Sequence, residues 1–388
     1  MKKILLTILA MGMILYSCQK EEQLSKQDVQ SFDEIIPNQY IVVLNVSPNK
    51  AFSTLDFTSK LKAVKEEAKE MAIQNSISVE SVQLTYGTAI RGFSAKLSDD
   101  ELNRLKNDSR VKYIVADKMF SLGDMHINKK PTPPPPAGEE VPYGITRVGT
   151  ANGVGRTAWI IDTGIDYDHP DLTVDVSRAA NYTRARSADD DNGHGTHCAG
   201  IVAAKDNDLG VIGVAAGATV VPIKVLDRSG SGAYSQIISG IDYVVAHASA
   251  GDAANMSLGG GVYQPIDDAV YYASQTGIYF ALAAGNESDD ALNHSPARVN
   301  GPNIWTISAM DINDNWAYFS NYGTPVDYCM PGYNIYSTYK GGGYTTMSGT
   351  SMAAPHMCGV LLMTNGNPRT DGYVNGDPDG DPDPIGHL

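Results

Sequence analysis

The sequence of 388 residues is poor in cysteine, in positive charge and in long apolar segments. It has four cysteines, and none of them forms a Cys-x-x-Cys pair or a Cys/His pair with zinc-site spacing. Its 29 Lys and Arg residues are outnumbered by 44 Asp and Glu residues, which gives a formal net charge of −15. Because binding to nucleic-acid phosphates needs a surplus of cations, this balance argues against a nucleic-acid partner.

Only the N-terminus contains an extended apolar run. Two lysines precede an apolar stretch at 4–16, which has about the length of a signal-peptide core and is short for a membrane span. The stretch runs into LYSC at 15–18, which resembles a bacterial lipobox, and the QKEE that follows is similar to a surface-export signal of lipoproteins. We therefore expect a lipoprotein signal peptide at 1–17 and lipidation of Cys18. A plain secretory signal is the alternative.

The other cysteines are Cys198, Cys329 and Cys358. Three is an odd number, so at least one thiol is free or pairs between chains. Cys198 and Cys358 lie in apolar segments, which favours buried free thiols. A disulfide between Cys329 and Cys358 stays open as an alternative in an exported protein.

The first half of the chain divides into a tether, a small unit and a linker. Residues 18–37 are polar, and the run of four prolines within 122–140 predicts an extended, exposed linker. Between them, residues 38–121 show apolar patterns in the order β-α-β-β-α-β, which is the ferredoxin-like α+β arrangement. The predicted strands and helices are 39–46, 57–72, 82–87, 90–97, 98–108 and 111–117.

Residues 141–370 alternate apolar strands with helical stretches such as 233–249. The strands are apolar on both faces, as in a mostly parallel sheet, so we predict a doubly wound α/β domain. Active sites in such domains lie beyond the carboxyl ends of the strands. The chain ends in an acidic segment rich in Asp, Pro and Gly at 371–388, for which we expect neither helix nor strand.

Four chemically distinct side chains lie at predicted strand ends or helix starts. Asp162 ends the strand TAWIID, His194 stands between two glycines, Asn286 ends a strand and Ser351 begins a helix. Taken singly, each has an ordinary structural explanation: a turn, a buried histidine or a metal site with His197, a strand end, and a helix N-cap. Taken together they supply an orienting acid, a base, an amide donor and a nucleophile, which is the equipment for acyl transfer.

The segments around these residues resemble the signature segments of the subtilisin-like serine proteases, and most closely those of the proteinase K branch. The order Asp, His, Ser also matches this family, whereas an esterase or lipase would show a G-x-S-x-G elbow and the order Ser, Asp, His. The matching segments are IIDTGID (160–166), NGHGTHCAG (192–200), NMSLGG (255–260), AAGN (283–286) and GTSMAAPH (349–356).

The resemblance implies a role for each residue. Asp162 would orient His194, His194 would act as general base and then acid, and Ser351 would attack the peptide carbonyl. Asn286 and the Ser351 N–H would form the oxyanion hole. The residues that the resemblance assigns to substrate binding are Ser231, Gly232, Ser257, Leu258, Gly259, Gly260, Ala284 and Gly285. Gly259 and Gly260 leave room for a large apolar side chain N-terminal to the scissile bond.

The resemblance also implies that residues 38–121 are an inhibitory propeptide and that the chain is a self-processing zymogen. Cleavage would fall between about residues 119 and 141. Catalysis would need no cofactor, while structural calcium is open, with candidates at 188–192 and among the acids at 377–383. The protein would be a monomeric lipoprotein at the outer surface of a Gram-negative bacterium, with peptides and its own propeptide as partners. A catalytically silent peptide-binding module is the alternative.

Overall fold

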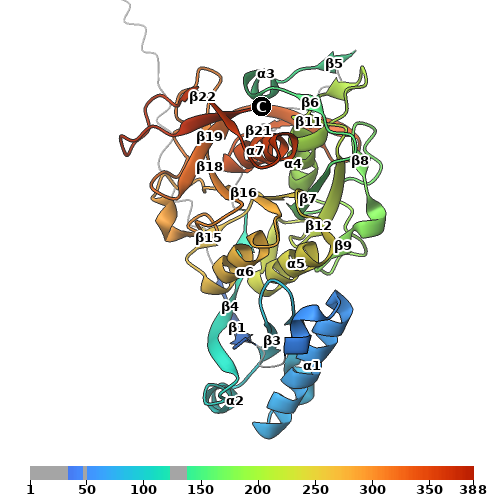
Figure 1. Ribbon diagram of the computed structural model, residues 1–388, viewed down its shortest axis with the longest axis vertical. Coiled ribbons are helices and arrows are strands. Elements are labelled where there is room, and N and C mark those ends of the chain that lie inside the picture. The colour runs from blue at the N-terminus through green and yellow to red at the C-terminus, as the bar shows by residue number, and fades with distance from the viewer. Residues whose placement is uncertain (1–33, 47–49, 123–137) are drawn as a thin grey trace, which may run out of the picture.

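The computed structural model describes residues 34–46, 50–122 and 138–388, which form a small N-terminal unit packed against a larger α/β unit (Figure 1). The predicted signal peptide, Cys18 and most of the proline-rich linker lie outside the described residues. Among the residues that are described, no helix combines the length and apolar character that a membrane span requires.

The N-terminal unit has the predicted ferredoxin-like order. Its sheet is antiparallel, with strands arranged β4-β1-β3-β2. Asp56 caps one helix, and Ser98 and Glu101 form a capping box on the other. The elements are β1 (Glu34–Leu44), α1 (Phe57–Gln74), β2 (Val82–Tyr86), β3 (Gly92–Lys96), α2 (Asp99–Leu105) and β4 (Val111–Ser121).

The larger unit is built on one sheet, which confirms the predicted doubly wound α/β class. Its strand order is β22-β23-β19-β18-β16-β14-β7-β12-β8, with β9 also paired to β12, and all pairs but β22–β23 are parallel. The strands are β7 (Thr157–Asp162), β8 (Thr173–Val174), β9 (Ala180–Asn181), β12 (Thr219–Lys224), β14 (Ala253–Met256), β16 (Tyr279–Ala283), β18 (Ile304–Met310), β19 (Val326–Pro331), β22 (Arg369–Tyr373) and β23 (Pro384–His387).

Helices cover both faces of this sheet (Figure 1). In β7, Ala158 and Ile160 belong to the core beneath α4 (His194–Ala203) and α7 (Thr350–Thr364). Trp159 and Ile161 belong instead to the core beneath α5 (Tyr234–His247) and α6 (Gln264–Ser274). Because successive side chains of a strand point to opposite faces, the unalternating apolar run was the correct indication of a sheet buried on both sides.

Short elements join these layers. The helices are α3 (Tyr143–Val148) and the 3-10 turns η1 (Lys50–Thr54), η2 (Val79–Ser81), η3 (Val176–Arg178) and η4 (Ala291–Asn293). The short strands are β5 (Glu139–Glu140), β6 (Ala151–Asn152), β10 (Gly210–Val211), β11 (Ala215–Ala216), β13 (Ser231–Ala233), β15 (Gly260–Gly261), β17 (His294–Ser295), β20 (Ile335–Tyr339) and β21 (Gly343–Met347).

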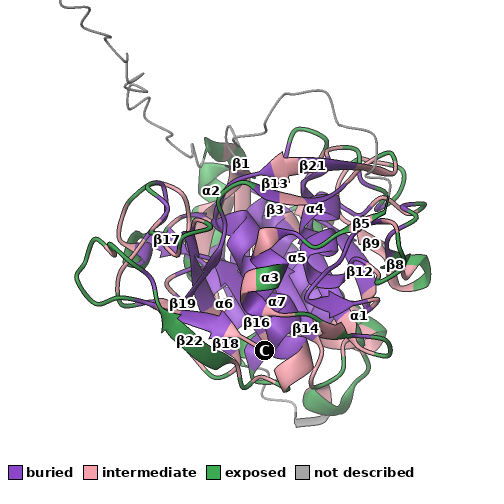
Figure 2. Cartoon of the chain, turned by 90° about the horizontal axis from the view of Figure 1, so that it is seen from above, coloured by how far each residue is buried: buried purple, intermediate pink, exposed green. Residues whose placement is uncertain are grey.

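The end of the chain differs from the prediction. Residues 371–388 were expected to contain no strand, but β22 and β23 form an antiparallel pair, and β23 extends the main sheet through Cys329↔Ile385. Ile385 is fully buried, while β22 is exposed at the rim of the molecule (Figure 2). The free edge of β19 supplies the hydrogen-bond partners, which is a tertiary effect that the local composition does not reveal.

The two units meet along an edge strand. β4 of the N-terminal sheet pairs antiparallel with β13, in the register Ser231↔Ser121, Gly232↔Phe120 and Ala233↔Met119. The pairing continues with Leu122 N, which donates to Gly230 O at 3.0 Å. The N-terminal unit thus lays an extended strand on the larger unit, in the manner in which an extended peptide is added to a sheet edge.

Candidate active site

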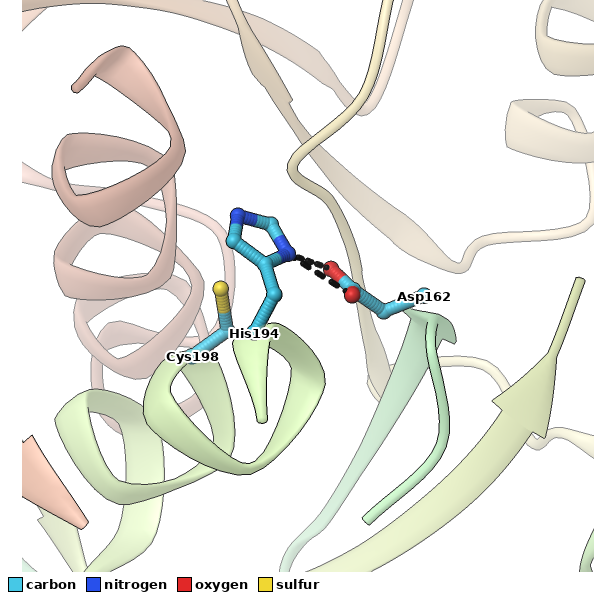
Figure 3. A group of neighbouring side chains, drawn as sticks. All are labelled: Asp162, His194 and Cys198. Atoms are coloured by element: carbon cyan, nitrogen blue, oxygen red, sulfur yellow. Dashed lines mark hydrogen bonds and ion pairs between the residues drawn. The ribbon is translucent and has the colours of Figure 1, made fainter. Parts of the chain in front are cut away.

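The structure brings Asp162 and His194 into direct contact. Asp162 is the last residue of β7, and His194 is the first residue of α4 after Gly193, whose φ of 117° favours glycine. His194 Nδ1 lies 2.7 Å and 2.9 Å from the two carboxylate oxygens of Asp162, and both side chains are fully buried (Figure 3). His194 Nε2 has no hydrogen-bond partner among the described residues. An imidazole that donates from Nδ1 to a carboxylate presents Nε2 as a proton acceptor.

Asp190 fixes the position of these two residues. Its Oδ1 accepts hydrogen bonds from Thr163 Oγ1 at 3.0 Å and Gly193 N at 2.9 Å, and its Oδ2 accepts from Thr196 N at 3.0 Å. Thr163 Oγ1 in turn accepts from Gly195 N at 2.9 Å. Asp190 therefore ties the residue after Asp162 to the first turn of the helix that carries His194. Burial raises the pKa of Asp190 above its ordinary value.

Ser351 lies in the first turn of α7, as predicted. The helix begins after Gly349, whose φ of 153° lies in the region that favours glycine. Ser351 Oγ donates to Ser257 O at 3.3 Å, and Ser351 O accepts from Ser257 Oγ at 2.7 Å and from Cys198 Sγ at 3.4 Å. The hydrogen bonds of Ser351 in this structure do not include one to His194. The long hydrogen bond to Ser257 O therefore holds the hydroxyl in another direction.

Asn286 lies beside the start of the same helix. Its Oδ1 accepts hydrogen bonds from Thr350 N at 2.8 Å and Thr350 Oγ1 at 3.1 Å. Asn286 Nδ2 and the Ser351 N each lie 3.7 Å from the place that a Cβ on Gly349 would occupy. Asn286 Oδ1 lies 3.6 Å from the same point, and since Oδ1 accepts from Thr350, Nδ2 is the end of the amide that is left to donate.

The predicted substrate-binding residues occupy two neighbouring regions. Ser231 and Gly232 belong to β13, which already pairs with β4. Ser257 contacts Ser351 through both its hydroxyl and its carbonyl, and Leu258 is buried in the core. Gly259 and Gly260 lie against Ser295: a Cβ on Gly259 would be 3.1 Å from Ser295 O, and Gly260 pairs with Ser295 between β15 and β17. Ala284 O accepts a hydrogen bond from Asn321 Nδ2, and Gly285 N donates one to Thr350 Oγ1.

Cys198 lies next to the site, although the sequence analysis did not place it there. It lies one turn after His194 on the same face of α4 (Figure 3). One ligand atom from each of Asp162, His194 and Cys198 falls within 4.8 Å of the others. Burial raises the pKa of the Cys198 thiol well above its ordinary value, so the thiol form, which donates to Ser351 O, is favoured. Both carboxylate oxygens of Asp162 contact His194, so the trio does not fit a resident metal ion.

The other predicted metal ligands do not form a group of three converging His, Cys, Asp or Glu side chains in the described part of the chain. His197 Nε2 contacts two carbonyl oxygens, and burial lowers the pKa of His197 to about 3. Asp190 is saturated by donors of the protein, and Asp191 is paired with Lys224 Nζ at 2.6 Å. The acids at 377–383 do not form a group of three with converging ligand atoms in the described part of the chain. Within the segment 188–192, expected as a calcium candidate, Asp190 and Asn192 accept hydrogen bonds from the start of α4.

Cys198, Cys329 and Cys358 are buried free thiols. The alternative of a disulfide between Cys329 and Cys358 is therefore wrong for this structure. Burial raises the pKa of both thiols, which keeps them protonated and unreactive.

Sequence reasoning missed Asp190, Thr163 and Thr350, which position the predicted site residues. A signal for Asp190 was present, because an acid just before a helix start is a common N-terminal cap. Thr163 and Thr350 each adjoin a site residue, Asp162 or Ser351, but only the folded chain shows where their hydroxyls donate and accept.

Two family models match this chain. The model described as "Subtilase family" matches residues 156–371, and the model described as "Peptidase inhibitor I9" matches residues 39–122. The first therefore covers the α/β unit with all four predicted site residues, and the second covers the ferredoxin-like unit.

Similar proteins carry related names. The alkaline serine protease ver112 of Corniculantispora psalliotae is 36% identical over 314 residues, which cover 76% of this chain and 77% of that protein. The alkaline serine exoprotease A of Vibrio alginolyticus is 38% identical over 346 residues, which cover 85% of this chain and 61% of that protein. The crystal structure of a cold adapted subtilisin-like serine proteinase has a TM-score of 0.53 and 39% identity, and covers 57% of this chain and 84% of that chain.

Proposed function

Since the chain belongs to the subtilase family and is a serine endopeptidase with an inhibitor-type propeptide, we propose that Asp162, His194 and Ser351 are its catalytic triad. Asn286 Nδ2 and the Ser351 N–H form the oxyanion hole. The observation that carries this proposal is the buried Asp162–His194 pair, in which His194 Nε2 has no hydrogen-bond partner among the described residues.

The chemistry follows from these positions. His194 Nε2 takes the proton of the Ser351 hydroxyl while Oγ forms a bond to the substrate carbonyl carbon. Negative charge develops on the carbonyl oxygen, where the two N–H donors stabilise it. His194 then gives the proton to the leaving amine, and water hydrolyses the acyl-enzyme by the same route. Side chains, one backbone N–H and water supply every step, so catalysis needs no cofactor.

For this sequence of events the Ser351 hydroxyl must turn from Ser257 O toward His194 Nε2. The hydrogen bond that it gives up is long, at 3.3 Å, and therefore weak. A bound peptide would occupy the cleft along Ser257 and favour the productive rotamer. We propose that residues Ser231, Gly232, Ser257, Leu258, Gly259, Gly260, Ala284 and Gly285 line that cleft, with a preference for a large apolar side chain N-terminal to the scissile bond.

The ferredoxin-like unit is the intramolecular inhibitor. Its strand β4 pairs with the edge of β13, and a protein substrate would need that edge of β13 for its own backbone hydrogen bonds. We propose that residues 38–121 are the propeptide, that residues 122–140 are the linker with the processing site, and that residues 141–370 are the catalytic domain. Ser351 itself would cut the linker, so that the chain is made as a self-processing zymogen.

The test is the intact mass of the protein expressed from residue 19, with wild type beside Ser351→Ala. We expect the wild type to lose about 105 to 120 residues and the variant to stay whole, because only the hydroxyl can attack. Ser249→Ala, at an exposed serine that is not among the proposed site residues, is the matched control and should process like the wild type. Processing of Ser351→Ala at the wild-type rate would contradict the proposal.

We also propose that the protein is exported as a monomer and anchored through lipid on Cys18 to the outer surface of a Gram-negative outer membrane. Cleavage in the linker would then separate the catalytic domain from the anchor, so the domain is either held by the retained propeptide or released. Cys18→Ala should move the precursor from the detergent phase to the aqueous phase in a phase-partition assay. A variant that stays in the detergent phase would point to another anchor.

The alternative is a catalytically silent module that binds peptides without cutting them. It predicts a lost triad or oxyanion residue, whereas Asp162, His194, Asn286 and Ser351 are all present. A serine-directed fluorophosphonate distinguishes the two readings, because only an activated Ser351 reacts with it.

A further inference from the structure

The inhibitory strand shows which way the side chains of a bound peptide point. Phe120 faces the larger unit: it is 2% exposed and its ring lies 6.4 Å from that of Tyr234. Side chains alternate along an extended strand, so Met119 and Ser121 face the other way. Ser231 Oγ donates to Ser121 Oγ at 3.2 Å, and Met119 lines a cavity on that side. The same geometry applies to a substrate that takes the place of β4 on β13.

This cavity has a volume of about 850 Å³ and lies between the two units. Ser231 of β13 lines it, as do Arg184 and Arg228 from two loops of the larger unit. Both arginines are exposed, and neither side chain has an ion pair or a hydrogen bond within the described part of the chain. Two guanidinium groups that have no partner among the described residues therefore border the cavity that Met119 also lines.

The carboxylates nearby are already engaged. Asp191 is paired with Lys224 Nζ, and Asp227 accepts hydrogen bonds from Ser229 N at 2.8 Å and Ser231 N at 3.2 Å. The remaining acid of the cavity, Glu34, belongs to the N-terminal unit and leaves with it when the propeptide dissociates. In the processed enzyme the cavity would hold the two arginines against one carboxylate that has no cationic ion-pair partner in the described part of the chain, that of Asp227, so positive charge would be in excess there.

We infer that Arg184 and Arg228 form a subsite for an acidic side chain of the substrate, at the position that Met119 occupies in the precursor. Arginine suits this task, because its planar donors match a carboxylate and stay charged at any working pH. The inference rests on the proposed function, since it assumes that substrates bind along β13 as β4 does. The subsite would make the enzyme selective for peptides that carry a carboxylate side chain at the position of Met119, three residues before that of Leu122.

The test compares peptides with the sequence of residues 116–126, in which Met119 is replaced by Glu, Gln or Lys. We expect kcat/KM for the Glu peptide to exceed that of the Gln peptide by about threefold to tenfold at low salt, and the Lys peptide to be the poorest. Raising the salt to about 0.5 M should remove most of the difference by screening. The enzyme is the processed wild type, and mass spectrometry checks that all three peptides are cut at one bond.

The matched enzyme variants are Arg184→Gln/Arg228→Gln and Arg184→Lys/Arg228→Lys. In the Arg184→Gln/Arg228→Gln enzyme, the ratio of kcat/KM for the Glu peptide to that for the Gln peptide should fall toward one, while the Gln peptide is cut at the wild-type rate. The Arg184→Lys/Arg228→Lys enzyme should keep part of the preference for the Glu peptide. Equal rates for the Glu and Gln peptides in the wild type, or an unchanged ratio in the Arg184→Gln/Arg228→Gln enzyme, would overturn the inference.

Failure of the proposed function gives a different result. The protease assignment is tested by whether the Gln peptide is cut and whether Ser351→Ala abolishes that cleavage. The subsite is tested separately, by the ratio of kcat/KM for the Glu peptide to that for the Gln peptide. If no peptide is cut, fluorescence anisotropy of the same labelled peptides on the enzyme still measures whether the Glu peptide binds more tightly, and equal binding would overturn the subsite.

Discussion

The two ends of the Asn286 amide have separate tasks. Oδ1 accepts two hydrogen bonds from Thr350, which leaves Nδ2 as the donor toward the place where an oxyanion would form. Asn286→Ala should therefore lower kcat by about 10²- to 10³-fold and change KM little, because the lost donor acts mainly on the transition state. Steady-state kinetics on a peptide substrate checks this, and an unchanged kcat would remove Asn286 from the oxyanion hole.

Asp190 has a positioning task that is visible only in the folded chain. Asp190→Asn replaces one acceptor oxygen by an N–H₂ group, so either Thr163 and Gly193 or the two donors of Thr196 lose their partner. We expect a loss of about 1–3 kcal/mol in the free energy of unfolding.

We also expect Asp190→Asn to lower kcat without a matching rise in KM, because the Asp162–His194 pair is less well placed. Urea unfolding in the Ser351→Ala background and steady-state kinetics in the active enzyme measure the two effects. Asp189→Asn, at an exposed neighbour, is the control and should be close to wild type in both. A variant that loses stability but keeps its kcat would limit Asp190 to a purely structural role.

At this scale the sequence predicted the proposed catalytic residues but not the residues that hold them in place. Asp162, His194, Asn286 and Ser351 sit in characteristic segments at strand ends and helix starts, so their neighbourhood could be inferred from topology. Asp190 was instead counted with Asp189 as a calcium candidate, because a run of acids looks alike whether its partner is a cation or a set of N–H groups. Only the packing of β7 against α4 decides between them.

The β22–β23 pair carries a buried acid into the core of the larger unit. Asp383 accepts a hydrogen bond from Ser308 Oγ at 2.7 Å, and burial, helped by the nearby charges of Asp377 and Asp379, raises the pKa of Asp383 from 3.8 to about 7. A carboxyl with a higher pKa in the folded than in the unfolded chain binds its proton more tightly when folded. Its contribution to stability is therefore present below about pH 4 and is lost as the pH rises to about 7.

Asp383→Asn should consequently be more stable than the parent chain at pH 8 and close to it at pH 4, because the amide keeps an acceptor for Ser308 without the buried charge. Thermal unfolding between pH 4 and pH 8 in the Ser351→Ala background measures this. Asp381→Asn, at an exposed acid of the same segment, should shift the curve little at any pH. A destabilisation of Asp383→Asn that grows with pH would show that the ionised carboxylate is the favoured form.

Element prediction succeeded where local pattern and tertiary context agree. The helix expected at 233–249 is α5 at Tyr234–His247, and the helix expected at 57–72 is α1 at Phe57–Gln74. It failed for β22 and β23, whose composition of Asp, Pro and Gly disfavours strands. There the pairing of β23 with β19 and the burial of Ile385 outweigh the local preference, and no window of the sequence contains that information.

The contact between the two units has a buried centre and a partly exposed rim. At the centre, Asp242 of α5 is 1% exposed and accepts hydrogen bonds from the backbone N–H groups of Gly87, Thr88 and Ala89 at 3.0, 2.6 and 2.6 Å. At the rim, Asp268 of α6 accepts from Tyr113 Oη at 2.8 Å. Both acids lie on the larger unit, and both partner sets lie on the inhibitor.

The centre should govern how long the cleaved propeptide stays bound. Asp242→Ala leaves three N–H groups without their acceptor, two of them buried and that of Thr88 partly buried, which we expect to cost about 2 kcal/mol and so to weaken inhibition about 30-fold. Asp268→Ala removes the hydrogen bond from Tyr113 and the partly exposed ion pair with Lys112, contacts that water can replace, so its effect should stay within about fivefold. Size-exclusion chromatography of the processed protein, followed by the time course of peptide cleavage, measures the retained propeptide. If Asp268→Ala released it as readily as Asp242→Ala, the binding energy would be spread over the interface rather than concentrated on α5.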